Sequence, residues 1–311
     1  MNFLVYLSMR MINNNKKAAY MNTEFNEKKI ANDIESYLAS IGIVGEIKNI
    51  IPSSLITTLQ FYPKSGFKLP GDFNIGDIKC YVPHPSLVGY EYINIEIHNM
   101  NRQIVWLNPL INNKKFVESN SKIPLIFGVG ADNNPIYYDL ATANNILITG
   151  DKGRGKSVLL HSFIMALVSK SKKILIIDTK DDEYKSWAAL PNLCQPIINN
   201  PEQAIQTLQN ISCDVVIIDD ISDLLSINEK ATIQAIKKAQ ASGIHFIAAM
   251  RTPQSQINDL FPSRILFKTA GNNETEYLCP YGDMLFSANG RIPARIHTPW
   301  ICEEEIKKAL K

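Results

Sequence analysis

One short segment, residues 146–157, constrains the fold more than any other part of the chain. It reads ILITGDKGRGKS, an apolar run followed by a glycine-rich turn that ends in Lys156 and Ser157. This is the pattern G-x-x-x-x-G-K-[ST], preceded by a strand-like run and followed by a helical pattern, as a phosphate-binding loop requires. The pattern arises by chance in about one per cent of chains of this length. The segment therefore predicts a nucleotide-binding α/β fold.

The residue types in this loop suit a nucleotide triphosphate and its metal ion. Glycines let the backbone curl and aim its N–H groups at phosphate oxygens, and the following helix adds its positive dipole end. Lys156 is expected to reach the β- and γ-phosphates, and the Ser157 hydroxyl to ligate Mg²⁺. We therefore expect ATP and Mg²⁺ as cofactors. The predicted contact residues are Gly150, Asp151, Lys152, Gly153, Arg154, Gly155, Lys156 and Ser157.

The second half of the chain alternates short apolar runs with amphipathic segments. This alternation is typical of a parallel sheet covered by helices on both faces. Strands are predicted at 146–149, 173–178, 214–219 and 244–250, and helices at 157–168, 201–210 and 230–241. A hairpin is expected across 123–139. The predicted fold class is α/β, a P-loop NTPase of the RecA-like type.

The first half has a different pattern. A helix is predicted at 27–41, and short strands at 45–51, 54–62, 78–82, 92–98 and 103–107. We expect a disordered Asn/Lys-rich tail at 1–24, a small α+β domain at 25–111, a polar linker at 112–122 and the ATPase domain at 123–311.

Composition excludes several other classes of protein. The five cysteines and five histidines are dispersed without C-x-x-C spacing, which argues against a zinc site or a disulfide framework and suits a reducing cytosol. The net charge of +2 neither requires nor excludes a nucleic-acid partner. No run of about 18 apolar residues predicts a membrane span, and the apolar start is too short for one. Met11 and Met21 are alternative starts. We expect a cytoplasmic protein.

A second candidate feature is the apolar strand that ends in Asp219 and Asp220. Asp219 is the expected partner of Mg²⁺ through water, and Asp220 is expected to position or deprotonate the attacking water. Asp178 ends the preceding strand in the same way. It is either a further site residue or a polar strand cap, and both interpretations stay open. At the end of the strand 244–250, where many such ATPases carry a polar sensor, Met250 has no hydrogen to donate. This leaves Arg251 or Thr252 as the residue that could take the sensor role.

The order of these segments resembles that of the FtsK/SpoIIIE family of hexameric DNA translocases. The resemblance covers roughly residues 28–305, with its specific motifs in the second half. The motifs are PLIFG (124–128), NPIYYDLA (134–141), IIDTK (176–180), LPNL (190–193), IIDDISDL (217–224), ASGIHFIAA (241–249), PSRI (262–265) and GDMLF (282–286).

The resemblance implies further roles. Arg264 corresponds to the arginine that one subunit offers to its neighbour's ATP, with a surface arginine as the alternative. Arg291 and Arg295 lie where the family has a loop touching DNA phosphates, and a solvated turn is the equal alternative. The implied partners are double-stranded DNA and further copies of the chain in a hexameric ring.

The chain also departs from the family pattern. Asp220 replaces a glutamate, Met250 replaces a glutamine, and an insertion before Asp214 is missing. No orientation-reading winged-helix domain and no membrane anchor are expected. We expect an ATP-dependent double-stranded DNA translocase with a role in plasmid or mobile-element DNA transfer or segregation. Two alternatives are a degenerate paralogue that binds nucleotide and a partner but hydrolyses weakly, and a secretion-channel ATPase moving protein or single-stranded DNA.

Overall fold

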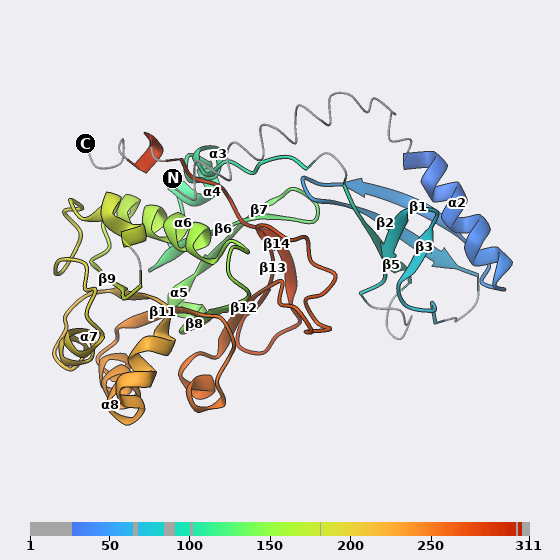
Figure 1. Cartoon of the computed structure of the whole chain (residues 1–311). Helices are drawn as coiled ribbons and strands as arrows, with labels where there is room; N and C mark the ends of the chain where they lie inside the picture. Colours follow the sequence, from blue (N-terminus) through green and yellow to red (C-terminus); the bar gives the residue numbers. More distant parts are fainter. Residues whose placement is uncertain are drawn as a thin grey trace. The chain divides into compact units, whose positions relative to one another are not determined.

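The structure is a computed structural model that describes residues 27–64, 68–83, 91–99, 102–180, 182–302 and 304–306. The chain divides into two compact units, Met1–Gln103 and Ile104–Lys311 (Figure 1). The predicted disordered tail, 1–24, lies outside the described residues.

The first unit is an antiparallel sheet with one helix packed on it. The sheet order is β1-β2-β5-β4-β3. Its elements are α2 (Glu27–Ser40), β1 (Gly45–Pro52), β2 (Ile56–Pro63), β3 (Phe73–Ile75), β4 (Ile78–Tyr81) and β5 (Ile93–His98). The helical spacing of Ile30, Ile34 and Leu38 puts all three on one face of α2, where they pack in one core cluster with Leu59 and Phe61 of β2. The predicted strand 103–107 does not form.

The boundary between the units differs from the predicted one. Residues after Gln103 belong to the second unit. Two one-turn helices form here, α3 (Leu107–Ile111) just before the predicted linker and α4 (Lys114–Val117) within it. Leu110 and Phe116 are buried in the core of that unit, and Asn113 caps α4 by accepting from the Lys115 N–H at 2.9 Å. Two apolar side chains are thus anchored among the polar residues of this segment, and 112–122 is grouped with the second unit.

The second unit is built on a nine-stranded sheet with the order β7-β6-β14-β13-β12-β8-β11-β10-β9. The strands are β6 (Pro124–Gly130), β7 (Pro135–Asp139), β8 (Ile146–Thr149), β9 (Ile174–Asp178), β10 (Val215–Asp219), β11 (His245–Met250), β12 (Ser263–Phe267), β13 (Asp283–Ser287) and β14 (Ala294–His297). From β12 to β9 every pairing is parallel, as predicted for β8, β9, β10 and β11. From β12 to β7 every pairing is antiparallel, so the sheet is mixed.

Helices cover both faces of this sheet, which confirms the predicted architecture. They are α5 (Leu140–Ala143), α6 (Lys156–Ser169), α7 (Pro201–Leu208) and α8 (Ile221–Ala241), with the 3₁₀ segments η1 (Asp182–Trp187) and η2 (Ser255–Leu260). In β8, Ile146 and Ile148 pack in the cluster that contains α6, whereas Leu147 packs in the cluster of α7 and α8 on the opposite side (Figure 1). None of the helices in the described ranges is long and apolar enough to cross a membrane.

Candidate nucleotide-binding site

The loop between β8 and α6 has the shape that its glycines allow. Gly150 has φ +148° and Gly155, the residue before α6, has φ +117°, values that residues with a Cβ rarely adopt. A Cβ at Gly150 would lie 2.6 Å from Phe267 Cβ of β12. The loop therefore packs closely against the neighbouring strand and leads directly into the first turn of α6, where helix N–H groups are available to an anion.

Lys156 is folded over this loop. Its Nζ donates to the carbonyl oxygens of Gly150 at 2.7 Å and Asp151 at 3.1 Å. Burial lowers the pKa of Lys156, against the opposing effect of Asp219 and Asp220. A half-buried ammonium held only by carbonyl oxygens, beside an open helix N-terminus, fits the charge and donor needs of a polyphosphate.

The acidic strand β10 brings its last residue to Ser157. The Asp219 Oδ2 atom accepts from Ser157 Oγ at 3.1 Å and from the Tyr184 hydroxyl at 2.9 Å. Burial raises the pKa of Asp219 although both donors favour its charged form, and burial also raises the pKa of Tyr184. A hydroxyl beside a carboxylate offers the oxygen ligands that Mg²⁺ prefers, so these residues fit the predicted metal ion.

Asp220 has a different setting from the one predicted for a water-positioning carboxylate. It adopts φ +68° and caps α8, its Oδ1 accepting from the Ser222 N–H at 3.2 Å, and its Oδ2 pairs with Lys180. Lys180 also lies 3.5 Å from Asp223. Burial works against ionisation, but the hydrogen bonds from Lys180 and Ser222 outweigh it and lower the pKa of Asp220. The carboxylate is thus ionised and already engaged.

The end of β11 presents a cation instead of a neutral sensor. Met250 is 1% exposed and belongs to the core on the α8 side of the sheet. The next residue, Arg251, accepts through its backbone oxygen from the Gly150 N–H at 3.2 Å, and its Nε lies 3.3 Å from Asp151 Oδ1. Asp151 also accepts from the Ala270 N–H at 2.9 Å. The phosphate loop is therefore tied to the ends of both flanking strands.

Arg264 lies away from this chain's own phosphate loop. It pairs with Leu147 in the β12–β8 register, and because Ile265 packs on the α6 side, Arg264 points to the opposite face. Its Nη2 donates to the backbone oxygen of Asn258 at 3.0 Å and to the side-chain oxygen at 2.8 Å. Its Nη1 has no hydrogen-bond partner among the described residues. Any role at a nucleotide would therefore be on another subunit.

Comparisons with known proteins agree with this geometry. The family model described as FtsK/SpoIIIE family matches residues 107–215. The DNA translocase FtsK of Helicobacter pylori (strain ATCC 700392 / 26695) is 27% identical, with 89% of this chain and 40% of the relative covered. That of Chlamydia trachomatis serovar D is also 27% identical, with 91% and 45% covered. Over residues 107–215 the chain is similar to the FtsK/SpoIIIE family.

The chain spans less than half the length of these FtsK/SpoIIIE relatives. The alignment with the H. pylori relative runs over 345 positions, more than the 311 residues of this chain, so the relative carries insertions that the chain lacks.

Solved structures support the fold. The pCW3 conjugation coupling protein TcpA, in a monomer form with ATPγS, has a TM-score of 0.55 at 12% identity, with 91% of this chain and 99% of that chain covered. The cytoplasmic domain of the Thermomonospora curvata Type VII secretion ATPase EccC has a TM-score of 0.55 at 15% identity, with 67% and 34% covered. Both likenesses show that the chain has an ATPase-type α/β fold.

The two arginines matched to the family's DNA-contacting loop differ from each other. Arg291 is exposed in the turn between β13 and β14 and stays a candidate. Arg295 is engaged within the fold, because its Nε lies 3.1 Å from Asp283 Oδ1 and its Nη2 lies 2.6 Å from Asp283 Oδ2. The side chains of Arg295 and Asp283 are only 8% and 1% exposed. The Arg295 guanidinium is used inside the fold, so Arg291 is the more accessible of the two candidates for a DNA contact.

Three residues of the site were missed by sequence reasoning. Tyr184 and Trp187 are fully buried in η1, and Trp187 Nε1 donates to His161 Nδ1 of α6 at 2.7 Å. The His161 and Tyr184 rings lie 4.8 Å apart. The available signal was two aromatic residues, three apart, directly after the strand that ends in Asp178. No motif marks this pattern.

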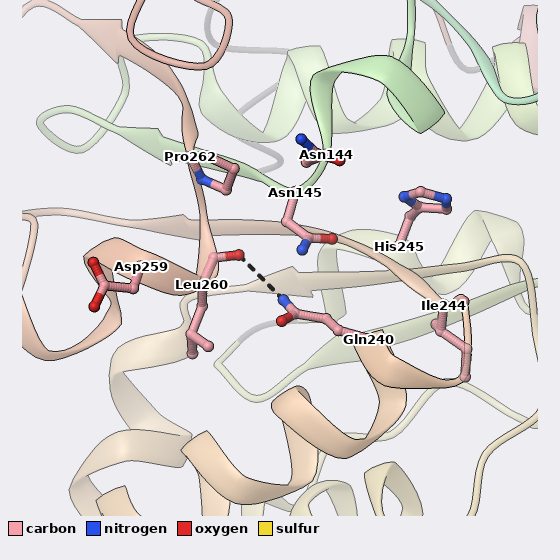
Figure 2. A pocket seen from close by; sticks show the side chains of 9 residues that line it. Asn144, Asn145, Gln240, Ile244, His245, Asp259, Leu260 and Pro262 are labelled. Atoms are coloured by element: carbon pink, nitrogen blue, oxygen red, sulfur yellow. Dashed lines mark hydrogen bonds between the residues drawn. The ribbon is translucent and has the colours of Figure 1, made fainter.

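A separate hollow lies at the amino ends of β8, β11 and β12 (Figure 2). Its polar side chains mostly connect segments of the fold: Asn145 Oδ1 accepts from the Phe246 N–H at 2.7 Å, and Gln240 Nε2 donates to the Leu260 oxygen at 3.1 Å. Ligands of open α/β sheets bind at the carboxyl ends of the strands, where the phosphate loop lies. We assign no ligand to this hollow.

Proposed function

We propose that this chain binds Mg²⁺ and ATP at the phosphate loop, hydrolyses the ATP within a ring of identical subunits in the cytoplasm, and moves double-stranded DNA. The observation that carries the proposal is the hydrogen bond between Ser157 and Asp219. It joins the loop to the acidic strand at the carboxyl edge of the sheet, where ATPases of this fold hold the metal.

Each residue has a role that follows from its setting. The amides of the loop and of the first turn of α6 bind phosphate oxygens, and Lys156 exchanges its carbonyl contacts for the β- and γ-phosphates. Ser157 and Asp219 hold the hydrated metal, and Asp220 orients the attacking water. When bound, ATP with Mg²⁺ supplies the phosphoanhydride whose hydrolysis drives movement.

The ring is supported by the placement of Arg264. Its guanidinium faces away from the loop of its own chain, with Nη2 bound to Asn258 and Nη1 buried without a hydrogen-bond partner among the described residues, so a side-chain movement would accompany this role. In a ring it would stabilise transition-state charge on the neighbouring subunit's nucleotide.

DNA as the moved substrate is supported by the family. The curated relatives are DNA translocases, and contacts with the DNA backbone would give movement without sequence specificity. The fold shared with a conjugation coupling protein supports a role in plasmid or mobile-element DNA transfer.

The test is ATP turnover by the full chain, with and without linear double-stranded DNA, beside the variants Lys156→Ala and Arg291→Ala. The motor proposal expects severalfold stimulation by DNA, loss of turnover in Lys156→Ala, and weaker stimulation with retained basal turnover in Arg291→Ala. Stimulation by single-stranded DNA or protein alone would favour the secretion-channel alternative.

One observation favours a second candidate, a paralogue that binds nucleotide and a partner but hydrolyses weakly. Asp220 is engaged by Lys180 and by the α8 cap, and both contacts stabilise its present position, so only its remaining acceptor sites are open to a water molecule. ATP binding without turnover, unchanged by DNA, would support this candidate over the motor.

A further inference from the structure

Two hydroxyl groups donate to the same oxygen of Asp219. Ser157 belongs to the phosphate loop and Tyr184 to η1, and both reach Oδ2, at 3.1 Å and 2.9 Å. The other oxygen, Oδ1, accepts no hydrogen bond from the residues that the structure describes. The carboxylate is thus fixed through one oxygen and open at the other.

The proton count of these groups decides what each can offer a metal ion. Ser157 and Tyr184 each have one hydroxyl proton, and Asp219 when ionised has only acceptor sites. With its proton on Asp219, Ser157 turns its lone pairs to the site, where a hard cation takes oxygen ligands. With both donors on Oδ2, Oδ1 would be the oxygen that accepts from the water shell of the cation.

We propose that Tyr184 is a positioning residue that holds Asp219 in the orientation in which its Oδ1 receives the hydrated Mg²⁺ of the nucleotide. The inference rests on the proposed nucleotide binding at this loop and adds a residue to it. The Tyr184 hydroxyl contacts Asp219. It acts through the carboxylate.

Contacts with α6 keep the Tyr184 ring in place. The ring lies fully buried against His161, and His161 accepts from Trp187 at the end of the same 3₁₀ segment. His161 is one helical turn beyond Ser157 on α6. The helix that supplies the metal-binding hydroxyl therefore also supports the tyrosine that orients the metal-binding carboxylate, and little side-chain freedom remains to be lost on metal binding.

The test measures binding of ADP to the full chain, first in EDTA and then across a Mg²⁺ titration, for wild type and Tyr184→Phe. The variant removes one oxygen atom and keeps the ring against His161, so it is expected to fold. We expect ADP affinity in EDTA to stay unchanged and the Mg²⁺ concentration for half-maximal effect to rise at least about fivefold, because a hydrogen bond to a charged group is lost.

Tyr137→Phe is the matched control. It removes a hydroxyl that donates to the Leu110 backbone oxygen at 2.9 Å in the same unit, remote in the fold from Asp219. Its Mg²⁺ titration should match that of wild type. Adding Tyr184→Phe to Asp219→Asn should weaken the Mg²⁺ effect no further, since Tyr184 acts through Asp219.

Three outcomes would overturn the inference. One is a Tyr184→Phe titration that overlays that of wild type. Another is an equal loss of ADP affinity in EDTA and in Mg²⁺, which is the result of a general structural defect. The third is a further loss in the double variant. Absence of ADP binding by wild type itself would instead remove the proposed function and this inference with it, so the two failures are distinguishable.

Discussion

Replacement of Arg295 by alanine is the sharpest test of the fold of the ATPase unit. The Arg295 side chain reaches from β14 to Asp283 on the neighbouring strand β13 and donates two hydrogen bonds to it, at 3.1 Å and 2.6 Å. Asp283 Oδ2 also accepts from the Cys279 N–H at 2.7 Å. Arg295→Ala removes the cation and leaves a carboxylate that is 1% exposed. Breaking such a buried pair costs about 3–5 kcal/mol.

That cost is large against the stability of a typical domain, about 5–15 kcal/mol. We therefore expect Arg295→Ala to lower the urea midpoint of the full chain strongly. A double variant, Asp283→Asn with Arg295→Met, removes both charges and keeps an oxygen for the Cys279 N–H. It should recover much of the lost stability, because no unpaired charge remains buried.

The assay is urea unfolding followed by circular dichroism, together with DNA binding by each folded variant. Arg291→Ala is the exposed control and should keep the wild-type midpoint. A loss below about 1 kcal/mol in Arg295→Ala would be the value of an exposed ion pair and would refute the buried arrangement. Weaker DNA binding with unchanged stability would restore Arg295 as a DNA contact.

Three further predictions follow from the geometry. Gly150→Ala should cost about 1–3 kcal/mol and abolish ADP binding, measured by thermal unfolding and titration, because its Cβ would overlap Phe267 at φ +148°. Burial raises the pKa of Cys80 and of Cys213 to about 12, so at pH 8 only about one thiol in ten thousand is ionised. Neither cysteine should therefore be alkylated by iodoacetamide until the protein is denatured, and mass spectrometry measures the alkylation. Arg251→Ala should weaken ATPγS binding severalfold more than ADP binding in parallel titrations, because the guanidinium lies at the carboxyl end of β11 beside the phosphate loop. An equal loss of affinity for both ligands would contradict this.

Periodicity predicted the central sheet well because its strands are buried on both faces. A run such as Val215–Ile218 has few structural alternatives once it is bounded by polar residues. The same reasoning failed for β12, β13 and β14. Parallel and antiparallel neighbours give similar apolar runs, so the mixed character of the sheet depends on chain connections that periodicity does not report.

Side-chain partners limited what could be predicted about the site. Ser157 and Asp219 are far apart in the chain, but strand order placed each at the carboxyl edge, and the structure brings them to 3.1 Å. No such rule applied to Arg295, since an arginine near a turn has the same sequence pattern whether it is buried or exposed. Nor did any rule link Tyr184 to Asp219, because the bond depends on how η1 packs against α6.

The parts of the site differ in how they are held, and this separates binding from turnover. The cradle is formed by backbone, with Gly150 and Gly155 at positive φ and with Arg251 and Ala270 connecting it to two strands. A backbone cradle is complete before a ligand arrives. Asp220, by contrast, is held by Lys180 and by its helix cap, so only its remaining acceptor sites are open to a water molecule. The structure therefore favours nucleotide binding with little more than a rearrangement of the Lys156 side chain, whereas any catalytic use of Asp220 competes with its contacts to Lys180 and Ser222.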